Sequence, residues 1–151
     1  MRDKVKILVV EDEIPVAMMM VHILTRAGCD VQAAHTGRKG MELAADSRFD
    51  LIALDIDLPD VNGFLICSEL KQRHITRHTP IIFISGRSKE EDLQRSLEVG
   101  ASDYITKPFE VDDFIFRIIS LARAKSSQSN FPDEHPDTDS QSFCNTAQGN
   151  Q

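Results

Sequence analysis

The chain has 151 residues, 41% of them hydrophobic, and a formal net charge of −7 at pH 7. This length suffices for one domain whose core needs no disulfide or metal to hold it. The single basic cluster, residues 71–78, closes a predicted helix, where cations suit the helix dipole. An acidic chain of this kind argues against a nucleic-acid-binding surface, and we expect no direct nucleic-acid partner.

Cysteines and apolar runs indicate the compartment. Cys29, Cys67 and Cys144 are an odd set without C-x-x-C spacing, which favours a reducing environment over a disulfide scaffold. The N-terminal apolar run is too short for a signal peptide, and no stretch approaches the roughly 18 apolar residues of a membrane span. We therefore expect a soluble, cytoplasmic protein that has no membrane partner.

Apolar runs and amphipathic stretches alternate along the chain. In chain order, the pattern predicts strand 5–10, helix 14–28, strand 30–34, helix 37–46, strand 51–55, helix 63–73, strand 80–85, helix 89–100, strand 103–106 and helix 110–125. Pro15 suits a first helical turn, while Gly28 and Gly100 suit helix ends. Such alternation predicts an α/β fold with a parallel sheet that helices cover on both faces.

The composition changes after Lys125. The segment 126–151 is rich in Ser, Asn, Gln, Asp and Pro, contains acids but no lysine or arginine, and offers little for burial. We expect a single domain over residues 4–125 and a disordered polar and acidic tail over 126–151.

Polar residues gather where the predicted strands end. The first strand leads into Glu11, Asp12 and Glu13, and the third ends at Asp55. In parallel sheets, sites form at the C-terminal strand ends. Clustered carboxylates repel one another unless a cation intervenes, and an oxygen-only set suits Mg²⁺ or Mn²⁺.

The fourth and fifth strand ends add a hydroxyl group at Ser85 and an ammonium group at Lys107. Metal, hydroxyl and lysine together are what a transferring phosphoryl group needs around it. Asp55 is then the expected nucleophile, since a carboxylate can form an aspartyl phosphate. The pair Asp55 and Asp57 leaves a second interpretation open, a phosphatase of the haloacid dehalogenase kind.

Four motifs identify a family resemblance. The chain resembles the receiver domain of two-component response regulators, the CheY-like family, over about residues 4–125. The matching motifs are ILVVEDE (7–13), DLIALDIDLPDVNG (50–63), PIIFISG (80–86) and GASDYITKPF (100–109). The resemblance implies a flavodoxin-like (βα)5 fold, a doubly wound five-stranded parallel sheet in the order 2-1-3-4-5.

The resemblance also implies a metal site and a phosphoacceptor. By position, Asp55 would accept the phosphoryl group. Asp12 would bind Mg²⁺ (or Mn²⁺) directly, Glu11 would act mostly through water, and the backbone carbonyl of Asp57 would complete the protein's share of the ligands. The side chain of Asp57 would take no part in the chemistry.

The remaining matches imply a switch. Ser85 would hydrogen-bond the phosphoryl group and Lys107 would pair with it, while Tyr104 matches the aromatic residue that turns inward when Ser85 moves. The peptide bond between Lys107 and Pro108 is expected to be cis.

Two positions depart from the common pattern. Asp57 carries a charge where many relatives are neutral, and Ser85 stands where Thr is common. Arg87 lies two residues after Ser85, and in this family positions 57 and 87 flank the attacking water. We hypothesise that Asp57 and Arg87 form an ion pair that tunes the lifetime of the aspartyl phosphate.

We expect a stand-alone response regulator and not an enzyme beyond its own phosphoryl chemistry. A histidine kinase or phosphotransfer protein would supply the phosphoryl group, and a downstream protein would read the switch. Many receivers dimerise through the fourth helix, fifth strand and fifth helix, and the resemblance extends that option here. One alternative is a receiver from a longer regulator with a DNA-binding or cyclase output domain. The phosphatase is disfavoured, because the chain leaves no room for a cap domain.

Overall fold

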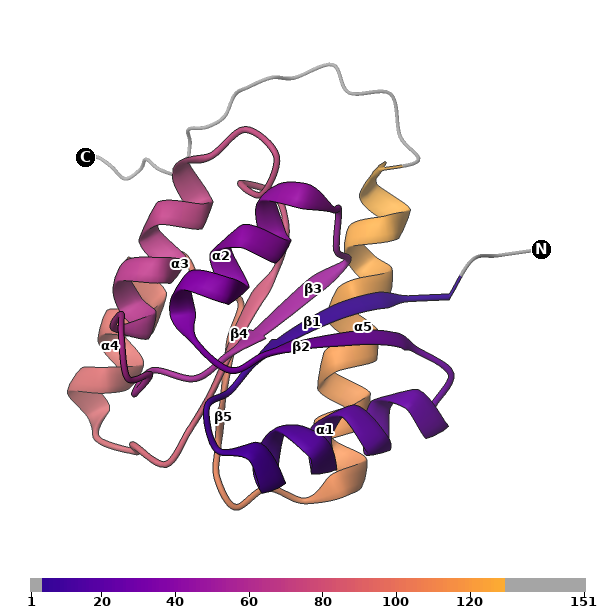
Figure 1. The fold of residues 1–151 in the computed structure, drawn as a ribbon, viewed down its shortest axis with the longest axis horizontal. Helices are drawn as coiled ribbons and strands as arrows, with labels where there is room; N and C mark the ends of the chain where they lie inside the picture. Colours follow the sequence, from indigo (N-terminus) through magenta and orange to yellow (C-terminus); the bar gives the residue numbers. More distant parts are fainter. Residues whose placement is uncertain (1–3, 130–151) are drawn as a thin grey trace.

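A computed structural model describes residues 4–129, in which strands and helices alternate along the chain (Figure 1). The elements are β1 (Lys6–Val10), α1 (Ile14–Arg26), β2 (Asp30–Ala34), α2 (Gly37–Asp46), β3 (Leu51–Leu54), α3 (Gly63–Gln72), β4 (Ile81–Ser85), α4 (Glu90–Glu98), β5 (Asp103–Thr106) and α5 (Val111–Ser129). Among the described residues, no helix is long and apolar enough to cross a membrane.

The five strands form one parallel sheet in the order β2-β1-β3-β4-β5. The expected flavodoxin-like topology is confirmed. Two helices, α1 and α5, cover one face of the sheet, and α2, α3 and α4 cover the other (Figure 1). All strand C-termini therefore meet at one edge of the sheet.

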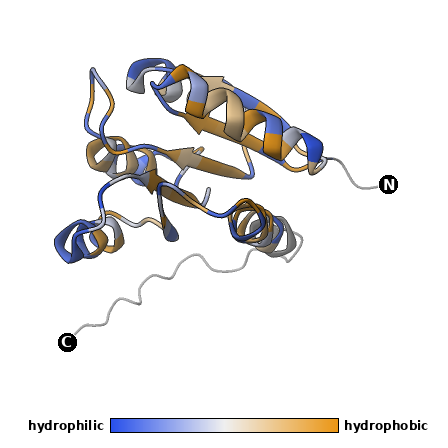
Figure 2. Cartoon of the chain, turned by 90° about the horizontal axis from the view of Figure 1, so that it is seen from below, coloured by the Kyte–Doolittle hydropathy of each residue, from blue (hydrophilic) through white to orange (hydrophobic). Residues whose placement is uncertain are grey.

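The central strands are buried on both faces, which explains their near-continuous apolar sequences. In β1, Ile7 and Val9 pack against α1 and α5, while Leu8 and Val10 pack into the core under α2 and α3. The edge strand β2 is less buried and correspondingly less apolar. Figure 2 shows largely hydrophobic strands flanked by helices in which hydrophobic and hydrophilic residues are interspersed.

Helix ends follow the predicted signals with one exception. Gly28 and Gly100 adopt φ angles of 96° and 97° just after α1 and α4, a left-handed conformation that favours glycine. The last helix, predicted to end at residue 125, continues to Ser129. No glycine or proline interrupts residues 126–129, so nothing in the backbone chemistry stops the helix there. The remainder of the predicted tail lies outside the described residues.

Candidate functional site

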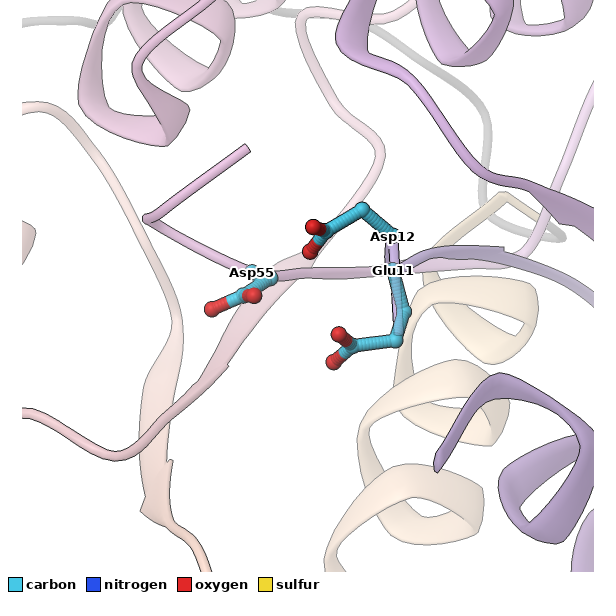
Figure 3. Close-up of side chains that lie close together, drawn as sticks. All are labelled: Glu11, Asp12 and Asp55. Carbon is cyan, nitrogen blue, oxygen red and sulfur yellow. The ribbon is translucent and has the colours of Figure 1, made fainter. Parts of the chain in front are cut away.

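Three carboxyl groups converge at the C-terminal edge of the sheet (Figure 3). Glu11 and Asp12 directly follow β1, and Asp55 directly follows β3, the neighbouring strand. One carboxylate oxygen from each lies within 4.8 Å of the others. Glu11 is fully buried and Asp55 is 6% exposed, whereas Asp12 is only partly buried. The sheet thus holds three acidic groups together at one edge, and Asp12 is the most exposed of the three.

Lys107 supplies a positive charge to this acidic cluster. Its Nζ atom lies 2.9 Å from Glu11 Oε1 and 3.8 Å from Asp55 Oδ2. Burial by itself lowers the pKa of Lys107, but the hydrogen bond to Glu11 and the Asp55 charge outweigh it, and the pKa is raised. The lysine therefore stays charged beside the carboxylates.

The phosphoacceptor candidate Asp55 is electrostatically strained without a metal. Burial, followed by the negative charge of Glu11, raises its pKa to about 6, although Lys107 partly compensates. A divalent cation at the three carboxylates would favour the ionised form of Asp55. Hard cations such as Mg²⁺ prefer oxygen ligands, and this donor set consists of oxygen alone, so the residues fit the expected metal.

The loop after Asp55 turns tightly back onto α3. A Cβ atom at Gly63 would overlap the carbonyl oxygen of Asp55, so only glycine fits there. Asn62 caps α3 through its side-chain oxygen, which accepts a hydrogen bond from Phe64 N at 2.8 Å. An isolated antiparallel bridge between Asp57 and Asn62 then holds the backbone at Asp57, whose carbonyl is the predicted metal ligand.

Asp60 anchors the same loop to a different helix. Its carboxylate accepts hydrogen bonds from the backbone N–H groups of Gly37 at 2.7 Å and Arg38 at 2.9 Å, at the start of α2. These bonds, that of Arg38 first, lower the pKa of Asp60. Sequence reasoning missed this residue, because a cap supplied from another segment leaves no local signal.

Ser85 and Tyr104 meet through the backbone of Arg87. Ser85 is fully buried, and its Oγ atom accepts a hydrogen bond from Arg87 N at 3.2 Å. The hydroxyl group of Tyr104 donates to the carbonyl oxygen of Arg87 at 2.6 Å. The two predicted switch residues therefore hold the same peptide segment, one from each side.

The side chain of Arg87 forms the hypothesised ion pair with Asp57. Arg87 donates from Nη2 at 2.7 Å and from Nε at 3.1 Å to the carboxylate. This hydrogen bonding lowers the pKa of Asp57, so the carboxylate stays ionised. A third nitrogen, Nη1, lies 3.5 Å from Asp92 Oδ1 on α4, a partner that the sequence analysis missed.

The structure thus brings Glu11, Asp12, Asp55 and Lys107 into one cluster at the C-terminal edge of the sheet. The peptide bond between Lys107 and Pro108 is cis, as expected from the resemblance. The roles assigned to these residues in phosphoryl transfer remain predictions.

Comparison with known proteins supplies the family. Residues 7–119 match the family model described as the response regulator receiver domain. The chain is 37% identical over 124 residues to the response regulator ArlR of Staphylococcus saprophyticus, covering 82% of this chain and 55% of that protein. It is 36% identical over 118 residues to the DNA-binding dual master transcriptional regulator RpaA of Synechocystis, covering 78% and 49%. The chain spans about half the length of these curated relatives.

Solved structures show the same fold. A CheY-like response regulator receiver domain protein from Methanospirillum hungatei has a TM-score of 0.78 and 25% identity, over 83% of this chain and 99% of that one. The chemotaxis response regulator CheY4 of Vibrio cholerae has a TM-score of 0.75 and 28% identity, over 79% and 99%.

Proposed function

The chain belongs to the response regulator receiver family, and from that premise we propose that Asp55 accepts a phosphoryl group from a histidine kinase or a phosphotransfer protein. The observation that carries the proposal is the convergence of Glu11, Asp12 and Asp55 beside Lys107. In the transfer, a carboxylate oxygen of Asp55 bonds to phosphorus while the bond from phosphorus to the donor's imidazole nitrogen breaks. Hydrolysis later returns the carboxylate and inorganic phosphate.

The residues of the pocket divide this work. Glu11 and Asp12, together with the backbone carbonyl of Asp57, would hold Mg²⁺ (or Mn²⁺), which offsets the negative charge of the phosphoryl group and of the acidic cluster. Lys107 is 3.8 Å from Asp55 Oδ2, close enough to pair with an oxygen of a phosphoryl group attached there. The hydroxyl group of Ser85 would donate a hydrogen bond to another phosphoryl oxygen.

A change at Ser85 has a route to the surface. Arg87 N donates to Ser85 Oγ, so a turn of that hydroxyl toward a phosphoryl group would release Arg87 N. The carbonyl of the same residue binds the Tyr104 hydroxyl group. Phosphorylation would therefore shift the population of the loop between β4 and α4, together with Tyr104.

The ion pair of Asp57 and Arg87 would tune how long the aspartyl phosphate lasts. It lies at the exposed side of the pocket, where both side chains are about half exposed, at 55% and 44%. A guanidinium group held at this place restricts the approach of water to Asp55. We assign lifetime control to this pair.

The switched surface would bind a protein. Leu97 on α4 and Phe116 on α5 are 66% and 70% exposed, and these helices come directly before and after β5 in the chain. Large exposed apolar side chains favour protein contact. A downstream protein or a second copy of the chain would bind there, and sedimentation with and without phosphorylation distinguishes the two.

The receiver could pass on its signal in two ways, through a separate partner protein or through an output domain of the same chain. The expected stand-alone role sends the signal through a partner. The alternative, a receiver of a longer DNA-binding regulator, is favoured by the relatives, which are about twice as long as the matched segment and include one named as DNA-binding. The mass of the protein isolated from its native cell decides between these outputs.

Intact-mass spectrometry after incubation with acetyl phosphate and Mg²⁺ tests the central proposal. We expect one phosphoryl adduct that requires Mg²⁺ and is absent in Asp55→Asn. A folded protein that gains no adduct would overturn it. We further propose that the chain is not an enzyme acting on free esters, and sustained turnover of p-nitrophenyl phosphate would contradict this.

A further inference from the structure

The guanidinium group of Arg87 lies between two carboxylates from different parts of the fold. One edge of the group binds Asp57 in the loop after β3, with nitrogen–oxygen distances of 2.7 and 3.1 Å. The remaining terminal nitrogen, Nη1, faces Asp92 Oδ1 on α4 at 3.5 Å. Guanidinium is planar and carries five donors, so it can bridge two acids at once.

Asp92 is unusual for its position. It lies in the first turn of α4, yet it is only 8% exposed, whereas its neighbours Glu90 and Glu91 are exposed. A carboxylate this buried needs a partner, because desolvation otherwise opposes its charge. Within the described part of the chain, Arg87 is the cation that forms an ion pair with it.

Among residues 4–129, no other ion pair anchors the first turn of α4. Its N-cap residue, Lys89, makes no side-chain capping hydrogen bond. A helix start without a cap loses stabilisation of its free N–H groups. The contact between Arg87 and Asp92 instead links the first turn to the loop that precedes it.

The backbone of Arg87 belongs to the switch. Its N–H group donates to Ser85 Oγ, and its carbonyl accepts the hydrogen bond of Tyr104. One residue therefore contacts Asp57 beside the phosphoacceptor, both switch residues and α4.

We infer that Asp92 is a positioning residue, which holds the Arg87 guanidinium group between Asp57 and α4 and so ties the start of α4 to the phosphoacceptor pocket. In the unphosphorylated protein, this contact between Arg87 and Asp92 keeps the first turn of α4 folded. It also preserves the hydrogen bond from the Tyr104 hydroxyl group to the Arg87 carbonyl oxygen. A phosphoryl group on Asp55 adds negative charge near Arg87 and competes with Asp92 for it. The competition by a phosphoryl group rests on the proposed function, whereas the positioning role of Asp92 in the unphosphorylated protein does not.

Tyr104 makes the inference measurable. The sequence contains one tyrosine and no tryptophan, so the ultraviolet emission of the protein reports on Tyr104. Tyrosine emission responds to hydrogen bonding of its hydroxyl group. The test uses Asp92→Asn, Arg87→Ala and the variant that carries both substitutions. The control is Glu91→Gln, which removes an exposed acid from the same turn.

In the unphosphorylated protein, we expect Asp92→Asn to change the tyrosine emission and to accelerate amide hydrogen exchange at residues 90–93 by about three- to tenfold. Arg87→Ala should give changes of similar size, and the double variant should show no further effect, because both variants break one link. Glu91→Gln should match the parent. Arg87 is exposed, so its variant tests the inference even where Asp92→Asn folds poorly.

Beryllofluoride with Mg²⁺ mimics the phosphoryl group and tests its competition with Asp92 for Arg87. It should accelerate exchange at residues 90–93 in the parent and do so less in Asp92→Asn, where the tie is already broken. Additive effects of Asp92→Asn and Arg87→Ala, or behaviour of Asp92→Asn identical to Glu91→Gln, would overturn the inference. Absence of an acetyl phosphate adduct would instead count against the proposed function and leave the comparison of unphosphorylated variants decisive.

Discussion

Lys107 Nζ lies 2.9 Å from Glu11 Oε1 but 3.8 Å from Asp55 Oδ2, so the lysine binds the buried metal-ligand candidate more closely than the proposed phosphoacceptor. Glu11 is fully buried, and its carboxylate requires a compensating charge. In the absence of a divalent cation, Lys107 provides it. The lysine thus has a structural role in the resting protein in addition to its proposed role toward a phosphoryl group.

Replacing Lys107 by methionine should destabilise the metal-free protein by about 2–4 kcal/mol at pH 8, because it leaves a buried carboxylate unpaired. Urea unfolding measures the loss. Saturating Mg²⁺ should recover part of it, since the ion replaces the missing charge. The control Lys39→Met removes an exposed pair with Glu42, for which we expect about 0.5 kcal/mol or less. Equal losses in the two variants would contradict the structural role of Lys107.

The stability of the metal-free protein should fall as the pH rises toward neutrality. Asp55 has a pKa of about 6 in the folded chain and about 3.9 when unfolded. Its contribution to stability is therefore fully present below pH 4 and is lost as the pH rises through 6. Mg²⁺ should reverse this trend, because it favours the ionised carboxylate. Thermal unfolding at pH 5, 6, 7 and 8 should show a Mg²⁺-induced rise in Tm that grows with pH.

Asp55→Asn is the matched variant for this measurement. It removes the charge without changing the shape of the side chain, so the metal-free variant should exceed the parent in stability by about 1–3 kcal/mol at pH 8. Its Tm should depend less on pH and on Mg²⁺. A variant that is less stable than the parent at pH 8 would show that Asp55 is not under electrostatic strain.

Asp60 should matter for metal affinity although it lies outside the acidic cluster. Asp60→Ala removes the cap on α2 and frees the loop that carries Asp57. We expect a loss of about 1 kcal/mol of stability and a several-fold weaker Mg²⁺ affinity, measured by calorimetry. Thr36→Ala is a close control, since Thr36 Oγ1 caps the same helix by accepting from Lys39 N. It should cost similar stability but leave Mg²⁺ affinity unchanged, and equal affinities in both variants would refute the loop argument.

Arg87→Ala should shorten the life of the aspartyl phosphate by about two- to tenfold, because the guanidinium group no longer restricts water at the pocket. Arg87→Lys retains the charge but loses the two-point contact with Asp57, so an intermediate rate is expected. The decay of the phosphoryl adduct, followed by intact mass, measures the rates. If the phosphoryl adducts of the parent and of Arg87→Ala decay at the same rate, Arg87 does not control the lifetime of the aspartyl phosphate.

Much of the fold and the acidic pocket was predictable because both depend on local patterns. Buried parallel strands require continuous apolar runs such as 51–54, and each run delivers the residue that follows it to one edge of the sheet. Family resemblance then assigned predicted roles to Asp55 and Lys107, whose side chains the structure places 3.8 Å apart. The end of α5 was predicted too early, because helical propensity in a polar segment gives a weak boundary signal.

Asp60 and Asp92 were not predictable in the same way. Each looks like an ordinary acid in its own segment, one in a loop and one in an acidic helix start. The role of Asp60 comes from partners 22 and 23 residues away in the sequence, and that of Asp92 comes from its burial, and local sequence encodes neither. Such contacts depend on tertiary packing, and only the assembled loops reveal them.

Gly63→Ala, which adds one methyl group, should reduce the stability of the protein more than a methyl group added elsewhere in the site. A Cβ atom there would overlap the Asp55 carbonyl oxygen and come within 2.7 Å of Ile56 Cα, both of them backbone atoms that cannot rotate away. We expect a loss of about 2–4 kcal/mol by urea unfolding, and weaker Mg²⁺ binding because the strand end must shift. Gly86→Ala is the matched control, since nothing lies within 4 Å of its added Cβ atom. It should change stability by less than about 1 kcal/mol. Similar losses at the two glycines would show that the turn after Asp55 can relax, and that close packing of α3 does not fix the position of Asp55.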